Sequence, residues 1–181
     1  MVLALAGMVL VYFGVGCILA DTWRVDTTRT VRASPEQVAG LVRDFRSWAK
    51  WSSVEVTLGP QTTREVTGEP GTVGHRIAWS GNQGKAMLTI STVAPGGIDY
   101  DFHSQGPQDS QLLPRGKGRV EWVPDTGGCR VHWHDESTVD SLPGRWFLWF
   151  GALQERVREM QGTSLSAMEQ AISEGGTPSA K

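Results

Sequence analysis

The sequence predicts an α+β domain in which an antiparallel sheet of about six or seven strands packs against one long C-terminal helix. Two patterns lead to this prediction. Between Trp23 and Glu136, apolar and polar residues alternate in short segments separated by turn residues, as in strands with one buried face. Near the C-terminus, Gly144–Ile172 spaces its apolar residues three and four positions apart, as in an amphipathic helix. Consecutive strands joined by short turns are expected to pair antiparallel.

The predicted C-terminal helix has about seven or eight turns, enough to cross a small domain. Asp140 or Ser141 can cap it, and Pro143 suits its first turn. Gly162 lies on its polar side, where it costs about 1 kcal/mol relative to Ala and permits a bend. The apolar stripe consists of Trp146, Trp149, Phe150, Leu153, Val157, Met160, Met168 and Ala171. Two interpretations of this stripe stay open: ordinary core, or one wall of an apolar cavity.

The N-terminal segment Met1–Ala20 carries no charged side chain. About 20 apolar residues suffice to span a bilayer as a helix, so the segment predicts a single-pass transmembrane anchor. A cleaved signal peptide and a lipoprotein signal ending at Cys17 are the alternatives. Arginines follow the segment and none precedes it, which favours a cytoplasmic location for the domain that follows.

The first strand is expected over Trp23–Ala33, with its apolar residues on one face. Ser34 then serves as a helix N-cap and Gln37 as its capping-box partner, for a helix that ends near Val42. Asp44 can cap a second short helix that carries Phe45, Trp48 and Trp51.

The remaining strands follow as alternating segments. Val54–Leu58 is expected to form a weak strand, and Ser104–Gly116 a polar, mobile loop. The tail from Glu174 to Lys181 is expected to be disordered, which leaves a domain over residues 22–173. One sheet face should present large aromatic residues to the long helix: Trp79, Tyr100, Phe102, Trp122 and Trp133.

The amino-acid composition excludes some classes of function and favours others. Basic and acidic residues nearly balance, 17 against 19, and form no basic stripe, which argues against nucleic-acid binding. Eight tryptophans in 181 residues suit apolar cores, ligand pockets and membrane interfaces. A disulfide between Cys17 and Cys129 is not expected, because the first lies in the apolar N-terminal segment. The sequence contains no nucleophile elbow, Walker loop or dinucleotide fingerprint, and it predicts no cofactor.

Several motifs in this order resemble the START-related helix-grip superfamily, in particular its polyketide cyclase/dehydrase and lipid-transport (SRPBCC) group. They are Ala33–Val38, Asp44–Trp48, Trp51–Ser52, Trp79–Asn82 and Gly128–Trp133. The resemblance covers about Trp23 to Ile172. It implies a curved antiparallel sheet wrapped around a long C-terminal helix. Because the superfamily includes aromatase/cyclases, hydrolase-like proteins, lipid carriers and co-chaperone-like proteins, it implies no single activity and supplies no catalytic residues.

Three polar sites are candidates for chemistry. His132 and His134 share a strand face with Glu136, a spacing that could hold a metal, but this face is opposite the core and no further ligand is evident. We therefore predict no metal site. Alternation places Asp135 on the inner face, where burial would raise its pKa and suit it as a general base. His75, in phase with the following strand, is the second weak catalytic candidate.

Three functions follow as hypotheses. The first is a membrane-anchored domain that binds a hydrophobic or amphipathic small molecule, such as a lipid or a polyketide-like compound. The second is a cyclase, dehydrase or hydrolase acting on such a ligand. The third is a membrane-tethered module that binds an unidentified protein. The candidate ligand-binding residues are Trp79, Tyr100, Phe102, Trp122, Trp133, Trp149, Leu153 and Met160.

The apolar cluster at the start of the C-terminal helix, Trp146–Phe150, has two interpretations: burial under neighbouring loops, or contact with the bilayer. The linker after Ala20 is short, since an extended chain gains only about 3.3–3.6 Å per residue. We therefore expect the domain to sit against the membrane.

Overall fold

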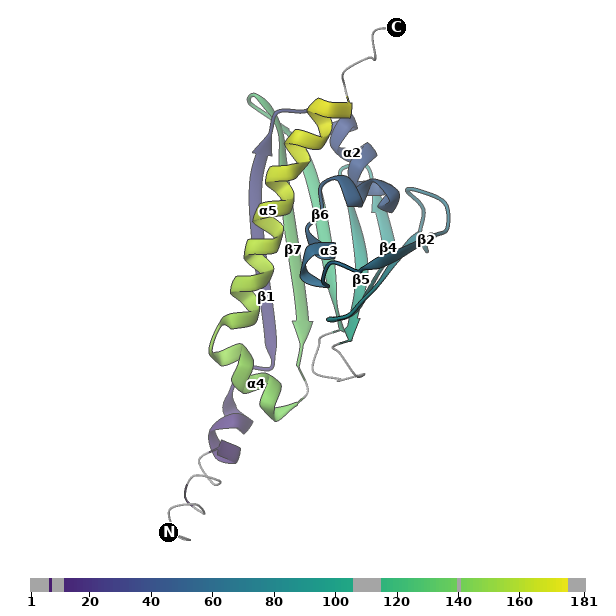
Figure 1. Ribbon diagram of the computed structural model, residues 1–181. Coiled ribbons are helices and arrows are strands. Elements are labelled where there is room, and N and C mark those ends of the chain that lie inside the picture. The colour runs from purple at the N-terminus through teal and green to yellow at the C-terminus, as the bar shows by residue number, and fades with distance from the viewer. Residues whose placement is uncertain (1–6, 8–11, 106–114, 140, 176–181) are drawn as a thin grey trace, which may run out of the picture.

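The computed structural model describes residues 7, 12–105, 115–139 and 141–175, and these contain a seven-stranded sheet (Figure 1). The strand order is β1-β7-β6-β5-β4-β3-β2, and every neighbouring pair is antiparallel. The strands are β1 (Thr22–Val31), β2 (Thr63–Thr67), β3 (Arg76–Gly81), β4 (Gly84–Ala94), β5 (Gly97–Gln105), β6 (Arg115–Asp125) and β7 (Gly128–Thr138). The predicted antiparallel sheet is confirmed.

Helices cover one face of this sheet. They are α2 (Pro35–Arg43), the 3₁₀ helix η1 (Phe45–Lys50), α3 (Val54–Thr57), α4 (Leu142–Trp149) and α5 (Ala152–Gly175). In Figure 1, α5 runs along β1, while α2, η1 and α3 lie over the remaining strands. The packing of a long C-terminal helix on the sheet is therefore confirmed.

Local capping chemistry places the first two helices where the sequence predicts them. Ser34 Oγ accepts a hydrogen bond from Gln37 N, and the Gln37 side chain accepts one from Ser34 N, which completes the capping box. Asp44 Oδ1 accepts from Arg46 N at 2.9 Å and so caps η1. Both predictions are confirmed.

The single helix expected over Gly144–Ile172 is instead two helices. Ser141 caps α4, as predicted, but α4 ends at Trp149. Gly151 has a φ of 74°, a left-handed conformation that interrupts the helix, and its carbonyl then accepts from Glu155 N to begin α5. The bend is therefore at Gly151 rather than at Gly162, which lies inside α5.

Two further boundaries differ from the prediction. Val54–Leu58 is not a strand, because Val54–Thr57 forms α3. Ser53, just before α3, is tied to α5: its hydroxyl donates to the Met160 carbonyl at 3.0 Å, and its N–H donates to Ser164 Oγ. This tertiary tie overrides the strand preference of two valines. At the C-terminus, α5 extends through Glu174 to Gly175, into the expected tail, and residues 176–181 lie outside the described part.

The register aligns inward-facing residues in rows across the sheet. One row consists of Val25, Asp135, Gly118, Tyr100 and Ile90. The next row, nearer α4, consists of Trp23, Ser137, Gly116, Phe102 and Leu88. In both rows β6 contributes a glycine, and a side chain there would collide with the aromatic ring on β5. The glycines thus let these rings lie across β6.

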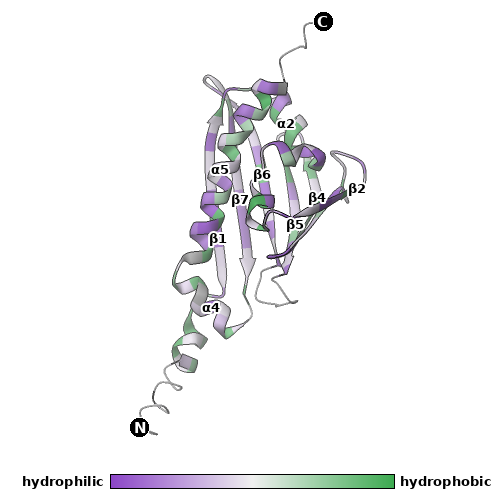
Figure 2. Cartoon of the chain, viewed as in Figure 1, coloured by the Kyte–Doolittle hydropathy of each residue, from purple (hydrophilic) through white to green (hydrophobic). Residues whose placement is uncertain are grey.

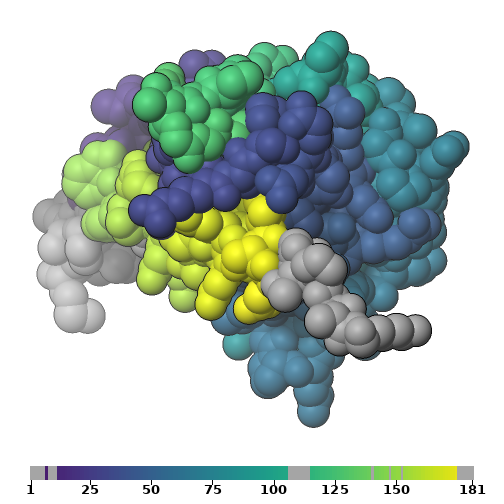
Figure 3. All heavy atoms as spheres, turned by 90° about the horizontal axis from the view of Figure 1, so that it is seen from above, coloured from purple at the N-terminus to yellow at the C-terminus, as the bar shows by residue number. Residues whose placement is uncertain are grey.

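The interior contains two apolar clusters. The first, which we call the tryptophan core, centres on five buried aromatic side chains whose rings touch: Phe45, Trp48, Trp51, Tyr100 and Trp133. Figure 3 shows α2 against the last turns of α5, so this end of the molecule is closed. The second, which we call the open-end cluster, lies toward α4 and consists of buried Trp23, Val25, Val139 and Leu148 with half-buried Phe102, Leu153 and Val157.

The N-terminal segment is described only in part. Residues 12–18 are helical, and Tyr12 stacks on Trp146 of α4 with ring centroids 5.6 Å apart. Among the described residues, no helix is both long and apolar enough to cross a bilayer. Half of the expected anchor, residues 1–6 and 8–11, lies outside the described part, as do residues 106–114 of the expected mobile loop. Cys17 and Cys129 are both free.

Candidate functional site

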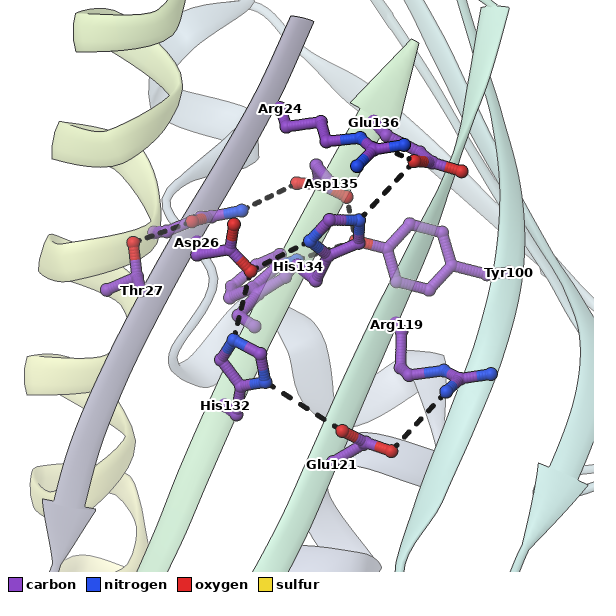
Figure 4. A network of polar contacts seen from close by, with 12 residues as sticks. Arg24, Asp26, Thr27, Tyr100, Arg119, Glu121, His132, His134, Asp135 and Glu136 are labelled. Atoms are coloured by element: carbon purple, nitrogen blue, oxygen red, sulfur yellow. Dashed lines mark hydrogen bonds and ion pairs between the residues drawn. The ribbon is translucent and has the colours of Figure 1, made fainter.

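A hydrogen-bonded network of polar side chains, most of them buried, crosses the inner face of the sheet (Figure 4). Tyr100 OH donates to Asp135 Oδ1 at 2.6 Å, and Trp133 Nε1 donates to Tyr100 OH at 2.6 Å. On the other side, Gln161 Nε2 donates to Asp135 Oδ2 at 2.8 Å, and Thr27 Oγ1 donates to Gln161 Oε1 at 2.7 Å. The network therefore joins β5, β7, α5 and β1 through one carboxylate.

Burial is the largest influence on the pKa values of the two acidic groups in this hydrogen-bonded network, Asp135 and Tyr100. It raises the pKa of Asp135 to about 6, although the hydrogen bonds from Tyr100 and Gln161 act in the opposite direction. Burial, followed by the nearby Asp135 charge, raises the pKa of Tyr100 well above its usual value. Such a carboxyl can exchange a proton near neutral pH. However, both of its oxygens already accept hydrogen bonds, one from Tyr100 on the sheet and one from Gln161 on α5. This arrangement suits a structural connection between α5 and the sheet.

Asp135 lies on the inner face, as the alternation of its strand predicts, whereas its partners Gln161 and Thr27 are not among the residues that the sequence pattern indicates. A signal for Gln161 was present, because it lies four residues from both Val157 and Leu165 and so falls beside the apolar stripe. A lone polar residue at such a position needs a buried partner. Gly118 was also missed: a side chain there would collide with Tyr100 and with Asp135, so the glycine lets the two groups meet.

The second catalytic candidate, His75, is fully buried in a different place. Its Nε2 accepts from Phe45 N at 3.0 Å, so Nδ1 carries the proton and donates to the Thr67 carbonyl at 3.0 Å. Its ring stacks on Phe45. His75 thus ties the end of β2 to η1. A catalytic role for Asp135 or His75 stays a prediction.

The predicted ligand-binding residues separate into three groups. Tyr100 and Trp133 belong to the tryptophan core. Trp79 and Trp122 belong to the same apolar cluster but lie under α3 and α2: Trp79 Nε1 donates to Glu55 of α3 at 3.1 Å, and the guanidinium of Arg43 on α2 lies 5.3 Å from the Trp122 ring.

The side chains of the third group are incompletely buried. Phe102, Leu153 and Met160 are half-buried, and Trp149 is 63% exposed on α4, outside the interior. The ring of Phe102 lies 6.1 Å from that of Trp23, whose buried Nε1 has no hydrogen-bond partner among the described residues. Incompletely covered apolar groups beside an unsatisfied donor are suited to an apolar ligand that carries a hydrogen-bond acceptor.

The outer face of the sheet carries a separate polar network (Figure 4). Asp26 Oδ1 lies 3.1 Å from His132 Nε2 and 2.8 Å from His134 Nδ1. The hydrogen bond from His134 is the largest influence on Asp26 and lowers its pKa. The network borders an open groove of about 610 Å³ along β5, β6 and β7. In the described part of the chain, no three His, Cys, Asp or Glu residues are arranged to hold a metal ion.

Solved structures share this fold at low sequence identity. A protein from Chromobacterium violaceum is 19% identical with a TM-score of 0.58, over 84% of this chain and 96% of its own. Ara h 8.0201 is 13% identical with a TM-score of 0.58, over 84% of this chain and 99% of its own. DynU16, from the dynemicin biosynthetic locus, is 13% identical with a TM-score of 0.54, over 84% of this chain and 48% of its own.

No curated protein matches the sequence. A family model described as "Polyketide cyclase / dehydrase and lipid transport" does match, over residues 22–172, which include the whole sheet and nearly all of α5. The chain therefore belongs to the polyketide cyclase/dehydrase and lipid-transport family, with the helix-grip fold that its sequence motifs indicate.

Proposed function

We propose that this chain binds a hydrophobic or amphipathic small molecule, of the lipid or polyketide-like class, against the open-end cluster while its N-terminal segment tethers it to a membrane. The observation that carries the first part is the incomplete burial of Phe102, Leu153 and Val157. These three apolar side chains come from β5 and α5 and face shared buried partners. An apolar ligand at this position would remove their remaining surface from water, which is favourable.

The family supports the ligand class. Its description names polyketide cyclases, dehydrases and lipid transport, and each of these activities requires binding of a hydrophobic small molecule. DynU16 comes from a biosynthetic locus, which is consistent with a small-molecule ligand. A carrier needs only a binding site, whereas an enzyme also needs an accessible reactive group. Asp135, the best candidate for that group, has both oxygens occupied, so we place binding before catalysis.

The membrane tether rests on Met1–Ala20, which carries no charged side chain. The described end of this segment is attached to α4. Arg145 lies at its base, with one guanidinium nitrogen donating to the Cys17 carbonyl at 3.4 Å and another 3.6 Å from the Asp21 carboxylate. A tether fixed at α4 would bring the open-end cluster close to the bilayer, where a hydrophobic ligand is concentrated. The cytoplasmic orientation is part of this proposal.

Photo-crosslinking of the full chain tests the site. The protein is reconstituted in phosphatidylcholine vesicles that contain a diazirine-bearing fatty acid, irradiated, and mapped by mass spectrometry. We expect labelled peptides that include Phe102 and Leu153. Leu153→Trp should lower this labelling about tenfold, since overfilling the site costs about 1.4 kcal/mol or more.

Val56→Trp is the matched control, because Val56 lies on α3 and is 79% exposed, so an added indole should leave the labelling unchanged. Labelling that persists in Leu153→Trp would show that the ligand binds elsewhere. Labelling confined to residues 1–20 would contradict the proposed binding site but agree with the proposed tether. If the uncleaved protein stays in the soluble fraction, the proposed tether is wrong.

A further inference from the structure

Five aromatic side chains form an exposed patch where the N-terminal segment meets α4. We call this the aromatic patch; it consists of Tyr12, Phe13, Trp146, Trp149 and Phe150. Phe13, Trp149 and Phe150 are 56%, 63% and 70% exposed. Figure 2 shows the N-terminal helical residues and parts of α4 in hydrophobic colours. Large apolar side chains gathered on one surface indicate a contact with something outside the chain.

The patch is held in place rather than loosely attached. Tyr12 stacks on Trp146 with an interplanar angle of 7°, and Trp146 Nε1 donates to the Tyr12 carbonyl at 3.3 Å. Trp149 and Phe150 are in edge contact, with ring centroids 5.2 Å apart. Gly16 lies directly against Trp146, where a side chain would collide with the indole. The N-terminal helical residues and α4 therefore present one continuous surface.

Helix α4 has two different sides. Leu148 is 5% exposed and packs into the open-end cluster, whereas its neighbour Trp149 points away from the interior. Leu142–Gly151 contains a single charged residue, Arg145, which is engaged with Asp21 and Cys17. The exposed side of α4 is thus aromatic and uncharged.

The sequence next to the patch indicates what covers it. Met1–Val11, which leads directly into Tyr12, has no charged residue. As a helix, residues 1–11 would rise about 16 Å, which is enough to enter one leaflet but not to cross the bilayer. A bilayer that received these residues would have its headgroup layer at the level of Tyr12. Tryptophan and tyrosine concentrate at that depth, because an apolar ring and a polar N–H or O–H suit the boundary between hydrocarbon and water.

We propose that the aromatic patch lies in the headgroup layer of the lipid bilayer and fixes the α4 end of the domain against the membrane. This inference rests on the proposed tether and is independent of the proposed ligand. It makes Trp149 and Phe150, at the end of α4, a second membrane contact, about 137 residues after the first in sequence and beside it in space. The open end of the interior then faces lipid.

Tryptophan fluorescence can test this in the full chain. Six of the eight tryptophans are buried in the protein interior, so bromine atoms attached to lipids should reach only Trp146 and Trp149. The six are Trp23, Trp48, Trp51, Trp79, Trp122 and Trp133. In phosphatidylcholine nanodiscs, we expect lipids brominated near the headgroup to quench part of the emission. Trp149→Phe should remove at least half of the quenched part while leaving the fold intact, since the side chain is exposed.

The matched control is Val73→Trp. Val73 is 65% exposed in the turn between β2 and β3, which leaves the sheet at the end away from α4. Its added emission should be quenched by iodide in the water and not by brominated lipid.

Each result decides the proposal. Quenching that is unchanged in Trp149→Phe, in a disc that retains the protein, would overturn the patch contact and leave the tether standing. Failure of the full chain to enter discs would overturn both. If Trp149 is shielded from lipid and iodide only in discs that hold two chains, a second copy covers the patch and the lipid proposal is wrong.

Discussion

The two apolar clusters of this domain lie on the same face of the same sheet and are built differently. In the tryptophan core, each ring touches at least one other ring, and all five side chains are fully or almost fully buried. In the open-end cluster, Phe102, Leu153 and Val157 keep part of their surface, and the neighbouring β6 position is Gly116. The comparison suggests that one end of the grip holds the fold and the other end is available for binding.

Truncation should separate the two clusters most clearly. Trp48 is fully buried, and its Nε1 donates to the Val42 carbonyl at 3.0 Å, so Trp48→Ala should lower the free energy of unfolding by about 3–5 kcal/mol. Phe102→Ala should cost about 1–2 kcal/mol, because less area returns to water. Urea unfolding of both variants, with unchanged m-values, measures the difference. Equal costs would mean that the open end is as firmly packed as the core.

How far the sequence predicts these clusters depends on the range of the interactions involved. The caps at Ser34 and Asp44 are decided within four residues, and strand alternation is decided within each strand, so both were predictable. The Ser53 tie to α5 joins residues 111 positions apart, and the strand predicted next to it is wrong. The left-handed φ of Gly151 divides the predicted C-terminal helix, because the spacing of apolar residues on both sides of it does not indicate a break.

The candidate site shows the same limit. Alternation alone puts Asp135 on the inner face, but the pairing of β5, β6 and β7 decides that it meets Tyr100 across Gly118. Its other partner depends on how α5 is rotated, which brings Gln161 to the carboxylate. The sequence does not indicate the exposure of Trp149 either, because on the helical wheel it lies among residues that pack against the interior.

The hydrogen-bonded network around Asp135, between the two clusters, should have an effect of intermediate size on the free energy of unfolding. This effect should be visible as a pH dependence. The folded-state pKa of Asp135 is about 6, above the usual value of 3.8 for an aspartate, so between these two pH values the folded state binds more protons than the unfolded state. Stability from this group is therefore greatest below about pH 4 and falls, by about 3 kcal/mol in total, as pH rises through 6. Denaturant midpoints across pH 4–7 measure the slope.

Asp135→Asn is the informative variant for this prediction. Its amide oxygen can still accept from Tyr100, and a flipped Gln161 amide can accept from its nitrogen, with Thr27 reversing its hydroxyl. The variant should fold and lose this part of the slope between pH 4 and 6. A retained slope would show that another group titrates there. The same variant tests catalysis, because full turnover once an activity is found would exclude Asp135 as the general base.

The outer-face network should have the smallest effect, because water competes for each of its contacts. Asp26→Asn removes the negative charge that His132 and His134 share but keeps an amide oxygen as acceptor. Because Asp26 is also more than half exposed, we expect a loss of about 0.5–1 kcal/mol that shrinks in high salt. Because the pKa of Asp26 is lowered in the folded state, its contribution to stability is present above the unfolded-state pKa and is lost as pH falls through the folded-state pKa. The sign of this pH dependence is opposite to that for Asp135. Measuring Asp26→Asn and Asp135→Asn on one pH axis therefore gives opposite slopes from the two faces of one sheet. If the two slopes had the same sign, the inner carboxylate would be hydrated like the outer one, and the interior toward α4 would be open to water as far as Tyr100.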